Sequence, residues 1–126
     1  MSCTIDFEHP AIGAQSIEVE ALTPEIFARE IAPARTFGFL HELNALRSAG
    51  LAGGASLENT LVFDETGVVN EAPLRFPDEC VRHKAIDLVG DLALIDAPLQ
   101  AFVTAHKAGH RLHHALVREI EARRNA

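Results

Sequence analysis

The segment PDECVRHKAIDLVGDLAL, residues 77–94, has the pattern that decides the fold. Pro77 and the two acidic residues after it are typical of the first turn of a helix. Apolar residues then recur at helical spacing, at Val81, Ala85, Leu88, Val89 and Leu92. The segment therefore predicts an amphipathic helix that runs to about residue 94 and turns one face into the core.

Weaker patterns on both sides of this segment predict short strands and further helices. Strands are expected at residues 3–7, 17–22, 35–39, 60–63, 68–69 and 101–105. Helices are expected at residues 23–33, 40–49 and 109–124. Because strands and helices are mixed without regular β-α-β alternation, the sequence predicts an α+β fold. We expect two layers, with a small sheet and helices packed on one of its faces.

Length and composition limit the classes of protein. The 126 residues are enough for one domain, and 48% hydrophobic with 23% charged residues is ordinary for a globular chain. The net charge of −7 disfavours nucleic-acid binding, because phosphates would be repelled. No apolar run approaches the roughly 20 residues of a transmembrane helix, and no signal-peptide pattern opens the chain. Two cysteines are too few for a disulfide scaffold, so a cytoplasmic location is expected.

Two polar residues in the 77–94 segment have the spacing of a partial metal site. His83 and Asp87 are four residues apart, so a helix places them on one face, with Asp91 one turn further along. An imidazole nitrogen and a carboxylate oxygen are both zinc ligands. This spacing is equally typical of a His–Asp contact on a solvated helix face, which is the commoner case.

Four histidines form a second cluster near the C-terminus, at His106, His110, His113 and His114. They are typical either of a metal site or of the exposed start of a helix. The only two lysines of the chain, Lys84 and Lys107, each directly follow a histidine. This coincidence suggests that the two segments act together.

Several short motifs then occur in a fixed order. They are residues 7–12, ARTFGF at 34–39, residues 61–64, LRF at 74–76, residues 79–91 and residues 101–110. Together they closely resemble the C-terminal half of UDP-3-O-acyl-N-acetylglucosamine deacetylase, the zinc amidase of the committed step of lipid A synthesis in Gram-negative bacteria. The resemblance covers about residues 4–117. It implies the second domain of a two-domain hydrolase whose active site lies between the domains.

The resemblance also implies a role for each matching polar residue. His83 and Asp87 correspond to two of the three protein ligands of the zinc, a ligand set that also accepts iron. Zinc-bound water attacks the acetamide carbon. His110 corresponds to the histidine that protonates the leaving amine, Asp91 to the carboxylate that orients this histidine, and Thr36 to a hydroxyl that stabilises the oxyanion.

A further set corresponds to residues that contact the UDP-linked substrate. Its members are Lys84, Lys107, Phe7, Phe37, Leu40, Leu43 and Ala52. The lysines correspond to groups near the carbonyl and diphosphate, the phenylalanines to the lining of the nucleotide or sugar site, and the last three to an acyl-chain passage. Structural or surface positions are expected for Cys3, Cys80, His41, His113 and His114.

The first domain of this family, which supplies the third zinc ligand and a general-base glutamate as an adjacent Glu-His pair, has no counterpart here. Glu8-His9 is not expected to replace that pair, because it matches a strand end and Pro10 opposes a helix. We therefore expect residues 1–126 to be a single, N-terminally truncated domain that is inactive alone. Its expected partners are the substrate and either the missing domain or a second copy. The alternatives are a non-catalytic module that binds nucleotide-sugar or metal, and a metal-binding module built on the C-terminal histidines.

Overall fold

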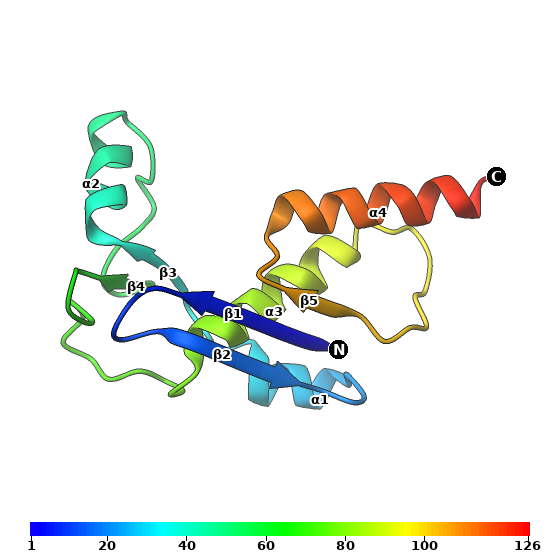
Figure 1. Ribbon diagram of the computed structural model, residues 1–126, viewed down its shortest axis with the longest axis horizontal. Coiled ribbons are helices and arrows are strands. Elements are labelled where there is room, and N and C mark those ends of the chain that lie inside the picture. The colour runs from blue at the N-terminus through cyan, green and yellow to red at the C-terminus, as the bar shows by residue number, and fades with distance from the viewer.

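The computed structural model describes residues 1–126, and its elements are shown in Figure 1. In chain order they are β1 (Ser2–Phe7), β2 (Gly13–Glu18), α1 (Pro24–Ile26), the π-helical turn η1 (Phe27–Ile31), β3 (Thr36–Phe39), α2 (Leu40–Ser48), β4 (Thr60–Phe63), α3 (Glu79–Leu92), β5 (Thr104–His106) and α4 (His110–Arg124). The α+β prediction is confirmed. None of the helices combines the length and the apolar content that crossing a membrane requires.

The strands divide between two small sheets. One has the order β2-β1-β5, with β1 antiparallel to β2 and parallel to β5. The other pairs β3 with β4 in parallel, and α2 connects these two strands. Each strand is short, so packing against α3 rather than sheet size holds this part of the fold together.

Helix α3 is the centre of the core, as its pattern predicts. Val81, Ala85 and Leu88 are fully buried, and they pack with residues of β1 and β4, among them Ile5 and Phe63. Burying one such aliphatic side chain contributes about 1.5–3 kcal/mol. The same helix contacts β1, β2, β3 and α4, so its polar face is held at a fixed position between them.

The second strand lies earlier than its alternating pattern predicts, at residues 13–18 instead of 17–22. The reason is the tight turn after β1, in which the amides of Ile12 and Gly13 both donate to the His9 carbonyl. Gly13 adopts a φ of 62°, which glycine tolerates best, and it pairs with Phe7. Pairing with β1 therefore sets the limits of β2, and alternation alone misplaced them.

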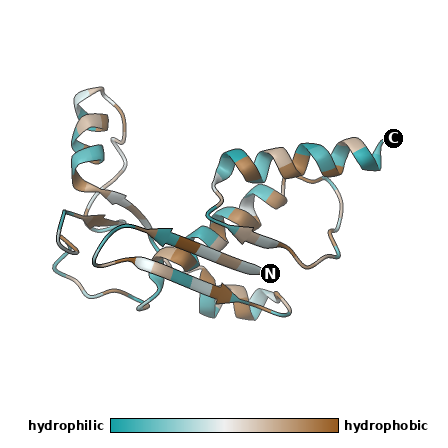
Figure 2. Cartoon of the chain, viewed as in Figure 1, coloured by the Kyte–Doolittle hydropathy of each residue, from teal (hydrophilic) through white to brown (hydrophobic).

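Two helices extend away from this core (Figure 1). Helix α2 buries none of its side chains, and α4 buries only His113 and Val117. Figure 2 shows mostly hydrophilic residues along α4, with hydrophobic ones between them. The two helices lie towards opposite ends of the longest axis, so only the first turns of α4 are placed beside the polar face of α3.

Candidate active site

His83 and Asp87 lie on one face of α3, with 3.4 Å between His83 Nε2 and Asp87 Oδ1. The other ring nitrogen of His83, Nδ1, is 3.0 Å from the carbonyl oxygen of Ala34. A carbonyl can only accept, so Nδ1 carries a hydrogen, and in the neutral form of the ring the Nε2 lone pair faces Asp87. Two electron-pair donors therefore face each other across a short gap.

This gap has the dimensions of a metal site. Two ligand atoms about 2.0–2.1 Å from a tetrahedral ion lie about 3.3–3.5 Å apart. The second contact of His83, to a backbone carbonyl, is the type of outer partner that fixes the tautomer of a metal-binding histidine. The donor set of one imidazole and one carboxylate fits zinc and also iron. The residues present thus fit the metal that the resemblance implies.

Asp91, one turn further along α3, accepts hydrogen bonds from three histidines of α4. His110 Nδ1 donates to Oδ2 at 2.6 Å, His113 Nδ1 to the same oxygen at 2.8 Å, and His114 Nε2 to Oδ1 at 3.0 Å. Burial raises the pKa of Asp91, but the hydrogen bonds from the three rings outweigh it and lower the pKa to about 2. The carboxylate is therefore ionised across the physiological pH range.

The Asp91 group also brings three possible ligand atoms, from Asp91, His110 and His114, within 4.8 Å of one another. Its internal distances nevertheless differ from those of a metal site. The N···O distances of 2.6 and 3.0 Å are hydrogen-bond lengths, shorter than the separation of two ligands on one tetrahedral ion. The geometry is that of an orienting network, and the exposed His106 is not part of it.

The two groups meet at His110. Its Nδ1 is held by Asp91, while its Nε2 lies 4.0 Å from Asp87 Oδ1. The ring is largely exposed on the side away from Asp91, whereas the Asp91 side chain is only 12% exposed. The free nitrogen of an oriented histidine thus lies beside the possible metal ligand Asp87.

Four of the predicted substrate-binding residues lie near one another. Lys84, Lys107 and Phe7 line a cavity of about 190 Å³ together with Asp6, whose carboxylate is 3.6 Å from the Lys107 ammonium. The Phe37 ring packs edge-on against Phe7 at 5.6 Å, and the Lys84 ammonium is 5.9 Å from the Phe37 ring centre. The pocket combines two cations and the Asp6 carboxylate with one aromatic wall, from Phe7.

The remaining predicted residues are more scattered. Thr36 is exposed at the start of β3, two residues after the Ala34 carbonyl that holds His83. Leu40 and Leu43 belong to α2, and Ala52 lies in the loop after it with a φ of 55°. Helix α2 projects away from α4 (Figure 1), so the structure does not bring these three residues close to the histidines of α4.

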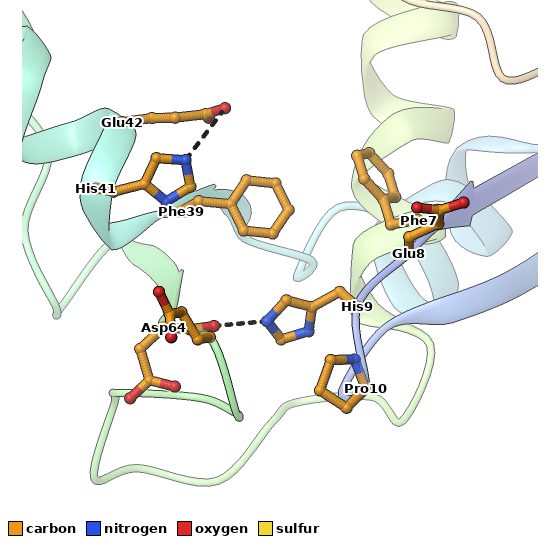
Figure 3. A pocket seen from close by; sticks show the side chains of 9 residues that line it. Phe7, Glu8, His9, Pro10, Phe39, His41, Glu42 and Asp64 are labelled. Atoms are coloured by element: carbon orange, nitrogen blue, oxygen red, sulfur yellow. Dashed lines mark hydrogen bonds and ion pairs between the residues drawn. The ribbon is translucent and has the colours of Figure 1, made fainter.

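A larger cavity of about 380 Å³ lies between the end of β1 and the β3-α2-β4 unit (Figure 3). His9 points into it and donates from Nε2 to the Asp64 carbonyl at 2.6 Å, while its Nδ1 accepts from the Ala11 amide. Glu8 lines the same cavity. Both ring nitrogens of His9 are engaged there, so this Glu-His pair lies in a different environment from His83 and Asp87.

The sequence interpretation missed two groups of residues. His113 and His114 were expected to be structural or surface positions, and the sequence did not indicate that both donate to Asp91 or that the His113 side chain is only 4% exposed. Glu79 and Arg35 form a buried ion pair, with Nε and Oε2 2.9 Å apart. Burial raises the pKa of Glu79, but hydrogen bonds from Arg35 and from the Arg75 amide outweigh it and lower the pKa. The only sequence signal for this pair is that both partners fall within the quoted motifs.

Comparison with known proteins agrees with the motifs. Residues 1–122 match the model of the family described as LpxC, UDP-3-O-acyl N-acetylglycosamine deacetylase. A protein of Oleidesulfovibrio alaskensis named UDP-3-O-acyl-N-acetylglucosamine deacetylase is 56% identical over 117 residues, which are 93% of this chain and 38% of that protein. A protein of the same name from Myxococcus xanthus is 52% identical over 120 residues, which are 95% of this chain and 38% of that protein.

The chain thus spans about two fifths of the length of the curated relatives it matches. Within that span, the family match covers residues 1–122 and the identity to both relatives exceeds half. The chain belongs to the UDP-3-O-acyl N-acetylglycosamine deacetylase family.

Proposed function

We propose that this chain supplies part of the active site of a metal-dependent hydrolase that removes the N-acetyl group of UDP-3-O-acyl-N-acetylglucosamine in lipid A synthesis. One observation carries the proposal, the 3.4 Å approach of His83 Nε2 to Asp87 Oδ1 with the His83 tautomer set by the Ala34 carbonyl. Family membership and the names of the relatives support the choice of substrate.

His83 and Asp87 are the residues that would hold zinc, or iron. When bound, such an ion lowers the pKa of a coordinated water to about 7 and polarises the amide carbonyl. In the chain itself, the Ala34 carbonyl keeps the hydrogen of His83 on Nδ1, so Nε2 remains free as a ligand.

His110 is the proposed general acid. Asp91 holds its Nδ1, so Nε2 faces outward beside Asp87 and can carry the proton that the leaving amine needs. The ionised Asp91 carboxylate accepts the hydrogen bond from Nδ1 and so holds the ring in this orientation. The Thr36 hydroxyl is proposed to donate to the oxyanion from the start of β3.

Substrate binding is proposed at the cavity lined by Lys84, Lys107 and Phe7. Two ammonium groups suit a diphosphate, and the paired rings of Phe7 and Phe37 offer flat apolar surface to a nucleotide or sugar. The acyl chain would run toward α2, where Leu40, Leu43 and Ala52 lie. Leu40 is exposed on that helix and free for such contact, whereas Leu43 is half-buried beside Gly38.

The third metal ligand and the general base are proposed to come from the other part of the family's proteins, on the same polypeptide or a separate one. His83 and Asp87 alone make a two-ligand site, and even loss of an outer partner typically lowers metal affinity 10–100-fold. Residues 1–126 by themselves are therefore expected to bind zinc weakly and not to turn over substrate.

The test is calorimetric titration with zinc, with deacetylation of UDP-3-O-acyl-N-acetylglucosamine followed in the same sample. It is run on residues 1–126 alone and with the part of the Myxococcus xanthus relative that this chain does not match. Weak binding and no turnover alone, both increased by the added part, would support the proposal. Tight zinc binding without turnover in either condition would favour a non-catalytic module. His106→Ala is the control, because His106 is exposed outside the Asp91 group.

A further inference from the structure

Glu79 and His83 hold opposite ends of one peptide group. The peptide bond between Ala34 and Arg35 presents its N–H to Glu79 Oε2 at 2.9 Å, and its carbonyl to His83 Nδ1 at 3.0 Å. Glu79 and His83 are four residues apart on α3, so they lie one turn apart on the same face. Two residues on one face of α3 therefore bind both the N–H and the carbonyl of a single peptide group in the segment before β3.

The Glu79 carboxylate is itself fixed on every side. Arg35 Nε donates to Oε2 at 2.9 Å and Arg35 Nη2 to Oε1 at 3.1 Å, while the Arg75 amide donates to Oε1 at 2.7 Å. Glu79 is only 1% exposed, and Ala34 is buried as well. The carboxylate thus has no free rotation with which to release the peptide group.

Each of the two arginines also donates to a backbone carbonyl two residues before the other arginine. Arg35 Nη2 donates to the Pro73 carbonyl at 3.3 Å, and Arg75 Nη1 donates to the Pro33 carbonyl at 2.7 Å. The Ala34 carbonyl, which contacts His83, therefore lies between the Pro33 carbonyl, held by the Arg75 side chain, and the Arg35 N–H, held by Glu79.

We propose that Glu79 is a positioning residue for His83, acting through the Ala34–Arg35 peptide group. It fixes the plane of that group, so the carbonyl always meets Nδ1 and the Nε2 lone pair always faces Asp87. Donation of the Arg35 N–H to a carboxylate also polarises the attached carbonyl and strengthens it as an acceptor. This inference rests on the proposed function of His83 as a metal ligand.

A purely structural ion pair would make different predictions, and two variants separate the cases. The double variant Arg35→Met with Glu79→Met removes both buried charges together, a replacement that folded proteins often tolerate, and leaves the residue 35 N–H without its carboxylate. Arg35→Lys keeps Glu79, a cation and the backbone N–H, but loses the forked guanidinium contact.

Two measurements are made, the first on residues 1–126 alone and the second with the completing part added, which is the part of the Myxococcus xanthus relative that this chain does not match. Long-range ¹H–¹⁵N correlation of the His83 ring, without metal and at a pH where the ring is neutral, reports which nitrogen carries the hydrogen. Zinc titration reports affinity. We expect wild type and Arg35→Lys to keep the hydrogen on Nδ1, and the double variant to show a mixture of tautomers with about 10–100-fold weaker zinc binding.

The inference is overturned if the double variant keeps a single Nδ1–H tautomer and wild-type zinc affinity. It is also overturned if Arg35→Lys mixes the tautomers, because the ion pair rather than the peptide contact would then control His83. This second result holds even if the double variant does not fold. Absence of zinc binding by wild type in the presence of the completing part would count against the proposed function, while the metal-free tautomer comparison would still decide the role of Glu79.

Discussion

The His83–Asp87 pair and the Asp91 group both combine imidazole with a carboxylate of α3, but the histidines of the Asp91 group come from α4 and the distances differ. In the first, a nitrogen and an oxygen face each other at 3.4 Å, with the ring hydrogen engaged elsewhere by the Ala34 carbonyl. In the second, ring hydrogens point at the carboxylate and the distances fall to 2.6–3.0 Å. The longer N···O separation of the first pair, together with the Ala34 carbonyl at Nδ1, therefore distinguishes a gap suited to a cation from an orienting network.

The largest effect is expected from removing the proposed acid. With the completing part supplied, His110→Ala should lower kcat about 10²–10⁴-fold, because proton transfer to the leaving amine is lost. Zinc affinity should stay close to wild type, since His110 is not among the proposed ligands. Steady-state kinetics and zinc titration of the same sample check both halves. A parallel loss of zinc affinity would assign His110 to the metal site. The Asp91 group would then take part in metal binding like the His83–Asp87 pair.

The next effect concerns the metal itself. His83→Ala should lower zinc affinity more than about 100-fold, because a direct ligand is lost. Loss of a residue that only hydrogen-bonds to a ligand typically lowers the affinity about 10–100-fold. His114→Ala is the matched control, since it removes an imidazole of the Asp91 group. Calorimetry on both variants compares the two groups directly. Equal losses would mean that the Asp91 group binds zinc in spite of its short distances.

The Asp91 group should also show itself in the pH dependence of stability. The pKa of Asp91 is lowered from 3.8, its value in the unfolded chain, to about 2 in the fold. The ionised carboxylate therefore stabilises the fold fully at a pH above about 4. This stabilisation is lost as the pH falls from about 4 through 2. The contribution is on the order of 2 kcal/mol. The difference in the free energy of unfolding between wild type and Asp91→Asn, measured with urea between pH 2 and 7, isolates this contribution. All other carboxylates are present in both proteins. A stability difference that does not narrow on acidification would contradict the low pKa.

The smallest effects separate the two additional histidines. His113 is buried, so His113→Ala loses a hydrogen bond and leaves a cavity, which should lower the free energy of unfolding by about 1–3 kcal/mol. The His114 side chain is 43% exposed, and His114→Ala should cost less than about 1 kcal/mol. Thermal or urea unfolding ranks the two. The reverse order would show that His114 rather than His113 supports the network.

Local patterns accounted for much of the fold. The α3 helix, the Thr23 cap with its following Pro24, and the α2 helix with Gly50 after it were all predicted, because each depends on neighbours within a few residues. The limits of β2 were wrong because strand pairing, a contact between distant segments, decides them. The strands also form two sheets, a division that no local pattern expresses.

The sequence by itself determined that His83 and Asp87 share one face, since the period of a helix is a local property. The family resemblance implied the contact of Asp91 with His110, but only the tertiary structure decided that His113 and His114 also converge on Asp91, because this requires the packing of α4 against α3. It alone also joined Glu79 to the peptide group that holds His83, across 44 residues of chain. Residue spacing carries the i, i+4 relation, whereas hydrogen bonds between distant segments depend on how the whole core packs.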